Sequence, residues 1–181
     1  MRKVTLAAVA AFAGCAALAV PAFAASTSTT SNLTVSLQVL AACTVSTTDL
    51  VFPTATANIS AGGLASVTPG KITVNCTETA PYEIGLGAGS QPGTAADTTT
   101  RRLFNSTTTS SNSHLSYDLY SDAGDTTHWG DTQSTDTVSG TGTGGAVDLS
   151  VYGKIVGSQN VALGTYSDTV LATVWYDDGT L

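Results

Sequence analysis

The sequence has few charged residues, and basic ones are the scarcest. Lysine and arginine together number six among 181 residues, against thirteen acidic residues, and the formal net charge is −7. Two of the six, Arg2 and Lys3, belong to an N-terminal segment that we expect to be removed, which leaves a net charge of about −9. Proteins that bind nucleic acid need clustered lysine and arginine to neutralise phosphates. The composition therefore argues against a nucleic-acid partner.

Long apolar runs are also absent, with one exception at the N-terminus. Residues 1–3 are Met-Arg-Lys, residues 4–20 are mostly apolar, and residues 22–24 read Ala-Phe-Ala, a small-x-small cleavage signal. This combination is typical of a secretory signal peptide and not of a membrane anchor. We expect residues 1–24 to be cleaved off near Ala24 or Ala25 and the remainder not to insert into a membrane. The alternative is a lipoprotein-type signal before Cys15, although Phe12 stands where such signals have a small aliphatic residue.

Cysteine is scarce as well, and the count is informative. If Cys15 leaves with the signal peptide, Cys43 and Cys76 remain as a pair. Two cysteines in an exported protein most often form a disulfide. The chain-entropy model assigns such a bridge, over 33 residues, about 3.5–4 kcal/mol of stabilisation. A metal site would need two more soft ligands, and neither histidine is near in sequence. We therefore expect a Cys43–Cys76 disulfide.

Catalytic and cofactor motifs are missing or lack their structural context. Residues 140–145, GTGTGG, match the dinucleotide-binding pattern, but the next residues alternate as in a strand, so this segment is expected to be a flexible loop. No nucleophile-elbow motif surrounds any serine. His114 and His128 lack metal-ligand spacing and are expected to be surface residues. We therefore predict a protein that is not an enzyme and that uses no cofactor.

The acidic segment 122–131 is the one place where a metal ion is worth considering. Asp122, Asp125 and Asp131 offer oxygen ligands of the kind that calcium prefers, but without the EF-hand spacing. Aspartates in glycine-rich turns usually stabilise the turn itself. We predict no metal site, and the sequence leaves calcium binding at this loop open.

Serine, threonine and glycine are abundant, and short alternating runs bounded by turn residues recur along the chain. This pattern predicts an all-β sandwich. The expected strands are 33–39, 43–45, 50–52, 72–76, 82–86, 103–105, 115–120, 147–155 and 166–176, and the expected loops are 87–100 and 139–145. Four aromatic residues are expected to fill the core rather than to bind sugar: Tyr117, Tyr120, Trp129 and Tyr152.

The first and last expected strands have no obvious neighbours. The first has one apolar face, formed by Leu33, Val35, Leu37 and Val39. The last alternates so that both faces carry apolar side chains, as in a strand that lies between two partners. Only five residues follow Tyr176, too few to supply a neighbouring strand. An uncovered edge of this kind aggregates unless something caps it.

Seven segments in a defined order carry a resemblance to a known family. They are CTV at 43–45, DLVF at 49–52, GKITVNCTETAPYEIGLGAG at 70–89, RRLF at 101–104, LSYDLYSD at 115–122, WG at 129–130 and VYGKIVGSQNVALGTYSDTVLATVWY at 151–176. In this order the chain resembles the spore coat protein U domain family, which includes the pilin subunits of archaic (Csu-type) chaperone–usher pili. The tail DDGTL and the serine- and threonine-rich stretch 107–113 depart from the family pattern.

The resemblance implies an incomplete immunoglobulin-like β-sandwich that lacks its last strand. In such pilins a donor strand from a neighbouring subunit completes the sheet, a form of strand addition. Residues 25–40 would be the donor-strand extension and residues 41–181 the pilin domain. The implied donor residues are Leu33, Val35, Leu37 and Val39. The implied edge strand of the acceptor groove holds Val170, Leu171, Ala172, Val174, Trp175 and Tyr176.

The implied function is that of a structural subunit of an extracellular bacterial pilus with a role in adhesion or biofilm formation. Its implied partners are a periplasmic chaperone, an outer-membrane usher and neighbouring pilin subunits, and its implied route leads through the periplasm to the cell surface. Two alternatives stay open. One is a secreted coat or matrix protein of the same family. The other is a monomeric carbohydrate-binding module, which would have a complete sheet and no need of an N-terminal strand.

Overall fold

The structure is a computed structural model that describes residues 26–177. The expected signal peptide and Cys15 therefore lie outside the described residues. The chain divides into two compact units, with the boundary between Leu37 and Gln38. Residues 26–37 of the first unit are exposed and pair with no strand, and residues 38–42 of the second unit are not in a strand either. The expected strand at 33–39 is thus absent from this structure of the single chain.

The second unit is an all-β domain. Its strands are β1 Cys43–Thr48, β2 Asn58–Ile59, β3 Leu64–Ala65, β4 Gly70–Cys76, β5 Pro81–Leu86, β6 Arg102–Phe104, β7 His114–Tyr120, β8 Val138–Thr141, β9 Ala146–Ile155, β10 Gln159–Asn160 and β11 Ala172–Tyr176, with a short 3-10 helix η1 at Thr98–Thr100. Among residues 26–177, no helix is long and apolar enough to cross a membrane.

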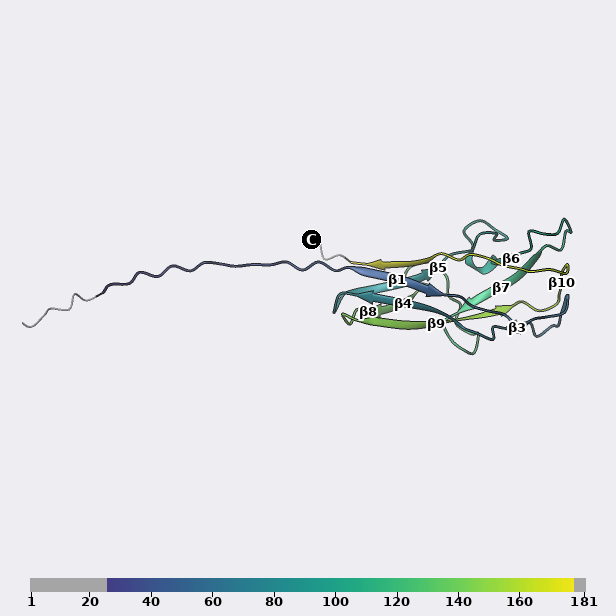
Figure 1. The fold of residues 1–181 in the computed structure, drawn as a ribbon, viewed down its shortest axis with the longest axis horizontal. Helices are drawn as coiled ribbons and strands as arrows, with labels where there is room; N and C mark the ends of the chain where they lie inside the picture. The colour runs from purple at the N-terminus through teal and green to yellow at the C-terminus, as the bar shows by residue number, and fades with distance from the viewer. Residues whose placement is uncertain (1–25, 178–181) are drawn as a thin grey trace, which may run out of the picture. The chain divides into compact units, whose positions relative to one another are not determined.

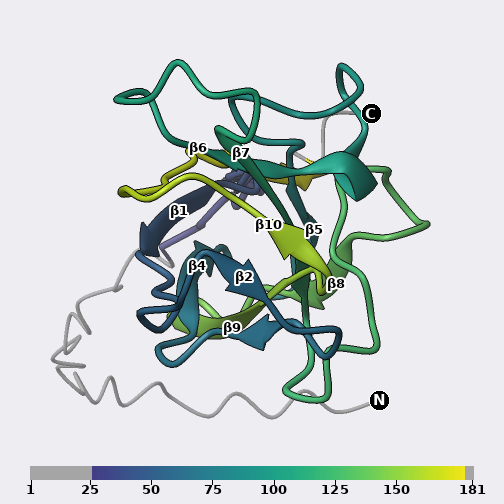
Figure 2. The same ribbon diagram turned by 90° about the vertical axis from the view of Figure 1, so that its right-hand side faces the viewer.

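The strands form one large curled sheet and two smaller ones, and all strand pairs are antiparallel. The large sheet has the order β1-β4-β9-β7-β6, with β3 also paired to β9, and the smaller sheets are β11-β5-β8 and β10-β2 (Figure 1). The first half of β9 pairs with β4 and the second half with β7. This change of partner curls the sheet around the core, so that β4 and β6 lie on opposite sides of it (Figure 2).

The core is built from strands whose side chains alternate with a period of two. Every second residue of β4 and of β7 is buried, as expected when one face of a strand packs inward. The largest core residue is Trp129, whose indole N–H donates to the Ile84 carbonyl at 2.8 Å. Tyr117 and Trp129 are buried as predicted, whereas Tyr120 and Tyr152 are only half-buried.

The expected disulfide is present and joins the first two strands of the large sheet. Cys43 and Cys76 are bonded to each other and face each other in the β1–β4 ladder. The bridge lies at the start of β1, immediately after residues 38–42. It fixes the position at which the N-terminal segment joins the domain.

Several expected boundaries differ from the structure. Residues 50–52 form a single bridge, Val51 to Thr68, and the last strand begins at Ala172 and not at 166. The expected loop at 139–145 contains β8, which pairs with β5. Gly140 is compatible with this strand because the Tyr82 ring fills the space that a side chain at 140 would need. Short β2, β3 and β10 and the helix η1 were also not predicted.

Candidate acceptor groove

Two strands of the domain lie at sheet edges and approach each other at one end. β1 is the outer strand of the large sheet, and β11 pairs with β5 alone. The two lie side by side in Figure 1. Further along, residues 47–57 and residues 161–172 border a groove of about 860 Å³. We call residues 47–57 the first wall and residues 161–172 the second wall.

The floor of the groove is apolar. It consists of core side chains from both sheets: Ile72, Leu86, Leu103, Leu115, Tyr117, Leu119, Val151 and Ile155. Most of these side chains are buried beneath the groove. A long apolar cleft bordered by two stretches of extended chain is suited to an extended segment with one apolar face.

From Ser167 to Leu171 the backbone of the second wall is bonded on one side only, whereas near its start the N–H of Val161 donates to the Ala57 carbonyl of the first wall at 2.9 Å. The N–H and C=O of Ser167 bond to Phe104 at 3.1 and 2.9 Å, and the C=O of Leu171 accepts from Gly87 at 2.9 Å. In an extended chain the backbone groups of successive residues point to alternate sides. Those of Asp168 and Val170 therefore point toward the groove, and they make no backbone hydrogen bond to any other residue that the structure describes.

The first wall has the same character. The N–H of Val51 donates to Thr68 at 3.0 Å, and its C=O accepts from Val67 at 2.9 Å. The backbone groups of Leu50 and Phe52 have no backbone partner within residues 26–177. Both walls are thus open edges, which is the arrangement that accepts an added strand.

The structure divides the predicted groove-edge residues into two groups. Val170 and Ala172 line the groove. Val174, Trp175 and Tyr176 lie farther along β11, where it pairs with β5, and Leu171 points outward and is 73 % exposed. The six predicted residues therefore belong to one strand edge but do not all border the groove.

The predicted donor residues share one property in this structure, their exposure. Leu33, Val35, Leu37 and Val39 are 87, 86, 88 and 73 % exposed. They contribute nothing to the buried core of the domain. Four large apolar side chains at this exposure within seven residues are costly in water.

Sequence analysis missed the first wall almost completely. Residues 53–57 have no alternating pattern, and their position beside the groove follows from the fold. It also missed two polar groups near the groove, the Tyr117–Asp168 pair and the buried cation Arg101, which donates to the Leu86 carbonyl. Periodicity cannot find a polar side chain whose partners lie on distant strands.

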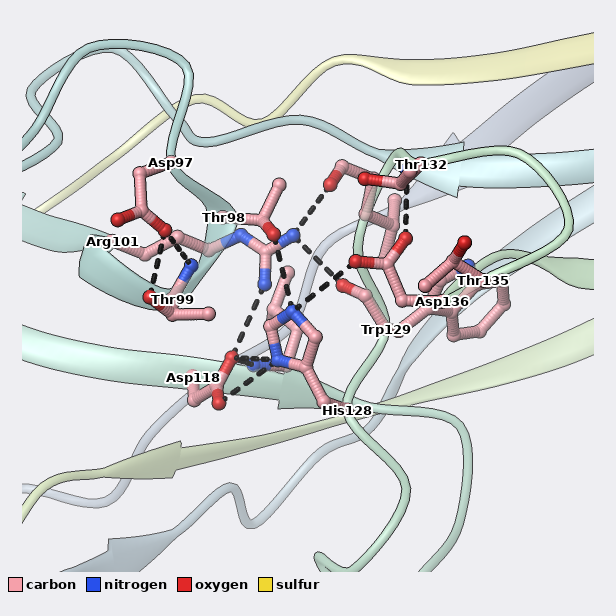
Figure 3. A network of polar contacts seen from close by, with 12 residues as sticks. Asp97, Thr98, Thr99, Arg101, Asp118, His128, Trp129, Thr132, Thr135 and Asp136 are labelled. Carbon is pink, nitrogen blue, oxygen red and sulfur yellow. Dashed lines mark hydrogen bonds and ion pairs between the residues drawn. The ribbon is translucent and has the colours of Figure 1, made fainter.

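Arg101 is fully buried next to the floor of the groove (Figure 3). Its guanidinium donates to the carbonyls of Leu86, Gly87 and Trp129 and forms an ion pair of 3.2 Å with Asp118. Burial lowers the pKa of Arg101, and the neighbouring Tyr117 and Asp118 oppose this shift. The cation joins the end of β5 to the segment around Trp129.

His128 is part of the same network and not a free surface residue, which corrects the expectation for this histidine. Its Nδ1 lies 2.9 Å from the Asp118 carboxylate, and its Nε2 lies 3.1 Å from the hydroxyl of Thr98 on η1. Figure 3 shows the ring between these partners. The contacts link η1, β7 and the segment before Trp129, so the network fixes loops above the sheet.

The acidic loop serves turn geometry in this structure. Asp122 accepts from the backbone N–H of Gly124 at 3.0 Å and of Thr127 at 2.6 Å. The hydrogen bonds from Thr127, together with those from Thr126, lower the pKa of Asp122 to about 2. Asp125 lies 3.7 Å from Lys154. Within residues 26–177, no three metal-ligating side chains form a group that could hold an ion.

Comparison with known proteins gives the family. The family model described as Spore Coat Protein U domain matches residues 29–173. The chain belongs to this family. A member of the spore coat protein U domain family is a structural protein, which agrees with the prediction that the chain is not an enzyme.

Two relatives are similar to this spore coat protein U domain. Protein U of Myxococcus xanthus is 38 % identical over 119 residues, which are 65 % of this chain and 64 % of that protein. The match thus spans slightly less than two thirds of that relative. The second is a chain in the crystal structure of the CsuC–CsuE chaperone–tip adhesion subunit pre-assembly complex from archaic chaperone–usher Csu pili of Acinetobacter baumannii. It aligns with a TM-score of 0.53 at 20 % identity, over 75 % of this chain and 40 % of that one. This likeness concerns the fold and confirms the predicted all-β, immunoglobulin-like class.

Proposed function

We propose that this chain is a structural subunit of an extracellular fibre that is assembled by donor-strand exchange. The observation that carries the proposal is the groove itself, with its apolar floor and two walls in which the backbone groups of Leu50, Phe52, Asp168 and Val170 have no backbone partner within residues 26–177. An inserted strand would pair with both walls and cover the floor. Without that strand, the domain is the incomplete immunoglobulin-like sandwich that the family resemblance implies, and the inserted strand would complete it.

The second part of the proposal is that residues 33–39 of one copy fill the groove of the next copy. The alternation of the segment suits an apolar floor below and solvent above. Burying each of the four apolar side chains stabilises the complex by roughly 1.5–3 kcal/mol. Ordering the backbone costs about 1–2 kcal/mol per residue, a sum of similar size. Hydrogen bonds to the two walls therefore decide whether the strand stays.

The proposed partners follow from the same groove. An uncovered groove with two open edges favours aggregation, so a subunit of this kind needs a periplasmic chaperone until the next subunit replaces it. An outer-membrane usher and neighbouring subunits complete the proposed route to the cell surface. The fold neighbour from Acinetobacter baumannii is itself described as a chaperone–subunit pre-assembly complex, which supports this part. A role in adhesion or biofilm formation belongs to the proposal as well.

The second candidate is a coat or matrix protein that polymerises by the same exchange. The family description and the similarity to Protein U of Myxococcus xanthus favour it. A monomeric carbohydrate-binding module is disfavoured, because such a module should have a closed sheet and no exposed apolar segment like residues 33–39.

The test is to supply the strand within one chain. Residues 30–40 are deleted from the N-terminus and fused after Leu181 through a long flexible linker. We expect a soluble monomer that unfolds cooperatively at a higher denaturant concentration than the mature chain. The control fusion carries the same segment with Val35 and Leu37 replaced by Asp and should gain nothing. A mature chain that is already a stable monomer, and that the fusion does not stabilise, would contradict the proposal.

A further inference from the structure

One side chain crosses the floor of the groove and contacts both walls. Tyr117 of β7 is 3 % exposed, and its ring centroid lies 6.2 Å from that of Phe52 in the first wall, edge to face at 70°. Its hydroxyl donates to Oδ2 of Asp168 in the second wall at 2.7 Å. A rigid aromatic ring therefore connects the two walls at mid-groove.

The contact on the second wall is anchored from several directions. Oδ1 of Asp168 accepts from the N–H of Ser90 at 2.7 Å, from its hydroxyl at 2.6 Å and from the N–H of Thr169 at 2.8 Å. Gly89 has a φ of +83°, and a Cβ at this position would overlap the Asp168 carboxylate. The loop after β5 thus approaches the carboxylate as closely as only glycine permits.

The contact on the first wall is also fixed. Phe52 packs directly on the backbone of β9, because a Cβ on Gly153 would lie 2.9 Å from the Phe52 ring and from Leu50. Burial and the adjacent Asp168 carboxylate raise the pKa of Tyr117, so its hydroxyl keeps its proton and remains a donor. Both ends of the connection are therefore held by groups outside the walls themselves.

We propose that Tyr117 and Asp168 set the width of the groove. Neighbouring strands lie about 4.8 Å apart, so two walls that bracket one added strand must stay about twice that distance apart. At one end of the groove the two walls are joined directly, because the N–H of Val161 donates to the Ala57 carbonyl at 2.9 Å. Farther along, the backbone groups of Asp168 and Val170 make no backbone hydrogen bond within residues 26–177 that would maintain this spacing. The Phe52–Tyr117–Asp168 connection maintains it before a strand enters. This inference rests on the proposed function, because it describes how the same groove is made ready for its strand.

The consequence is kinetic. Without the connection, only a fraction of the molecules have a groove of the right width, and the apparent association rate falls by that fraction. Once a strand is inserted, its hydrogen bonds hold both walls, and the connection contributes little. Tyr117 and Asp168 are therefore positioning residues that affect entry of the strand more than its release.

The test uses the mature chain, residues 25–181, with Val35→Asp and Leu37→Asp in every sample, so that its own donor segment does not fill the groove of another copy. A fluorescent synthetic peptide with the natural sequence of residues 31–40 is added, and binding is followed by stopped-flow anisotropy. Tyr117→Phe removes only the hydroxyl and keeps the ring against Phe52. We expect association to slow roughly ten-fold, the factor that corresponds to one lost hydrogen bond to a charged group, with dissociation unchanged within about two-fold. The control is Tyr152→Phe on β9, a half-buried tyrosine whose hydroxyl bonds to no other described side chain, and it should leave both rates unchanged.

Asp168→Ala should slow association as Tyr117→Phe does, and the double variant should be no slower than the slower single variant. If Asp168→Ala does not fold, Tyr117→Phe is followed by hydrogen exchange. Residues 166–171 should then exchange faster in the free chain and equally in the peptide complex. Equal association rates for wild type and Tyr117→Phe would overturn the inference, as would a change confined to dissociation. A wild-type chain that does not bind the peptide would overturn the proposed function together with it.

Discussion

The same two chain edges are bonded very differently at the two ends of the domain. At one end, β1 pairs with β4 over six residues and β11 pairs with β5 over five, and a disulfide joins β1 to β4. At the other end, the first wall has the single bridge Val51–Thr68 and the second wall the single bridge Phe104–Ser167. We call these the laddered end and the groove end.

The difference shows how one domain can be both stable and incomplete. The laddered end is held by backbone hydrogen bonds on regular strands. The groove end is held by one backbone bond between the walls, from Val161 to Ala57, and by side chains that reach across it from elsewhere. These side chains include Tyr117, Asp168 and Asn105, whose amide donates to the Leu163 carbonyl at 3.3 Å. Side-chain anchors leave the backbone edge open, and a ladder would have closed it.

The largest effect is expected at the groove end, when charge is placed on the donor segment. Val35→Asp together with Leu37→Asp should abolish polymerisation of the mature chain, measured by analytical ultracentrifugation. Each carboxylate would enter a dry apolar groove at a cost of several kcal/mol. The matched control, Thr34→Asp with Ser36→Asp, adds the same charge to the opposite face and should polymerise. Equal behaviour of the two double variants would show that residues 33–39 do not enter a groove.

The next largest effect concerns Arg101, whose guanidinium donates to the carbonyls of Leu86 and Gly87 at the end of β5. Arg101→Met should lower the free energy of unfolding by about 3–5 kcal/mol, because it removes the ion pair to Asp118 and leaves the carbonyls of Leu86, Gly87 and Trp129 without this donor. The measurement is urea unfolding of the chain with its donor strand fused in cis, so that the groove is filled in every sample. Arg102→Met is the control, since Arg102 is only partly buried and makes two bonds to loop carbonyls. A loss for Arg101→Met no larger than that for Arg102→Met would contradict this role.

At the laddered end, removal of the disulfide should cost somewhat less. The chain-entropy model gives about 3.5–4 kcal/mol for the 33-residue separation, and strain or residual structure commonly reduces the measured value. The variant is Cys43→Ser with Cys76→Ser in the same fused chain, compared by urea unfolding. In the chain without the fused strand, association of the donor peptide should not change, because the bridge lies outside the groove. If the variant changed the association rate strongly and the free energy of unfolding little, the disulfide would act on strand entry and not on the stability of the laddered end, which would contradict this prediction.

Sequence reasoning succeeded where the structure is regular. Period-two patterns located β4, β5, β7 and β9 to within a few residues, and cysteine parity identified the disulfide. Of the six predicted groove-edge residues, Val170 and Ala172 border the groove, and their role in accepting a strand stays a prediction. These features depend on local alternation or on a count of residues, and both are visible in one chain.

Sequence reasoning failed where contacts between distant segments decide the structure. Residues 53–57 of the first wall have no alternation, and β8 is a glycine-containing strand that pairs with β5, where the Tyr82 ring lies against Gly140. Arg101 resembled an ordinary surface cation, and its burial depends on three carbonyls and Asp118 meeting it from separate segments. None of these partners can be identified before the fold is known.

The smallest expected effect is on the pH dependence of stability, and it concerns Asp148 at the laddered end. Asp148 of β9 accepts from Thr73 at 2.6 Å and from Lys71 at 2.9 Å, both on β4, and these bonds lower its pKa. A depressed pKa contributes stability that is present above the unfolded value of about 3.9 and is lost as the pH falls through the folded value. Unfolding of the fused chain between about pH 5 and pH 2 should therefore depend less steeply on pH in Asp148→Asn than in wild type. The effect should be small, because the group is exposed.

Since these bonds lie in the β4–β9 ladder, Asp148→Asn should leave the association rate of the donor peptide at neutral pH unchanged. A slower association would mean that the two ends are coupled and that the ladder also contributes to the shape of the groove.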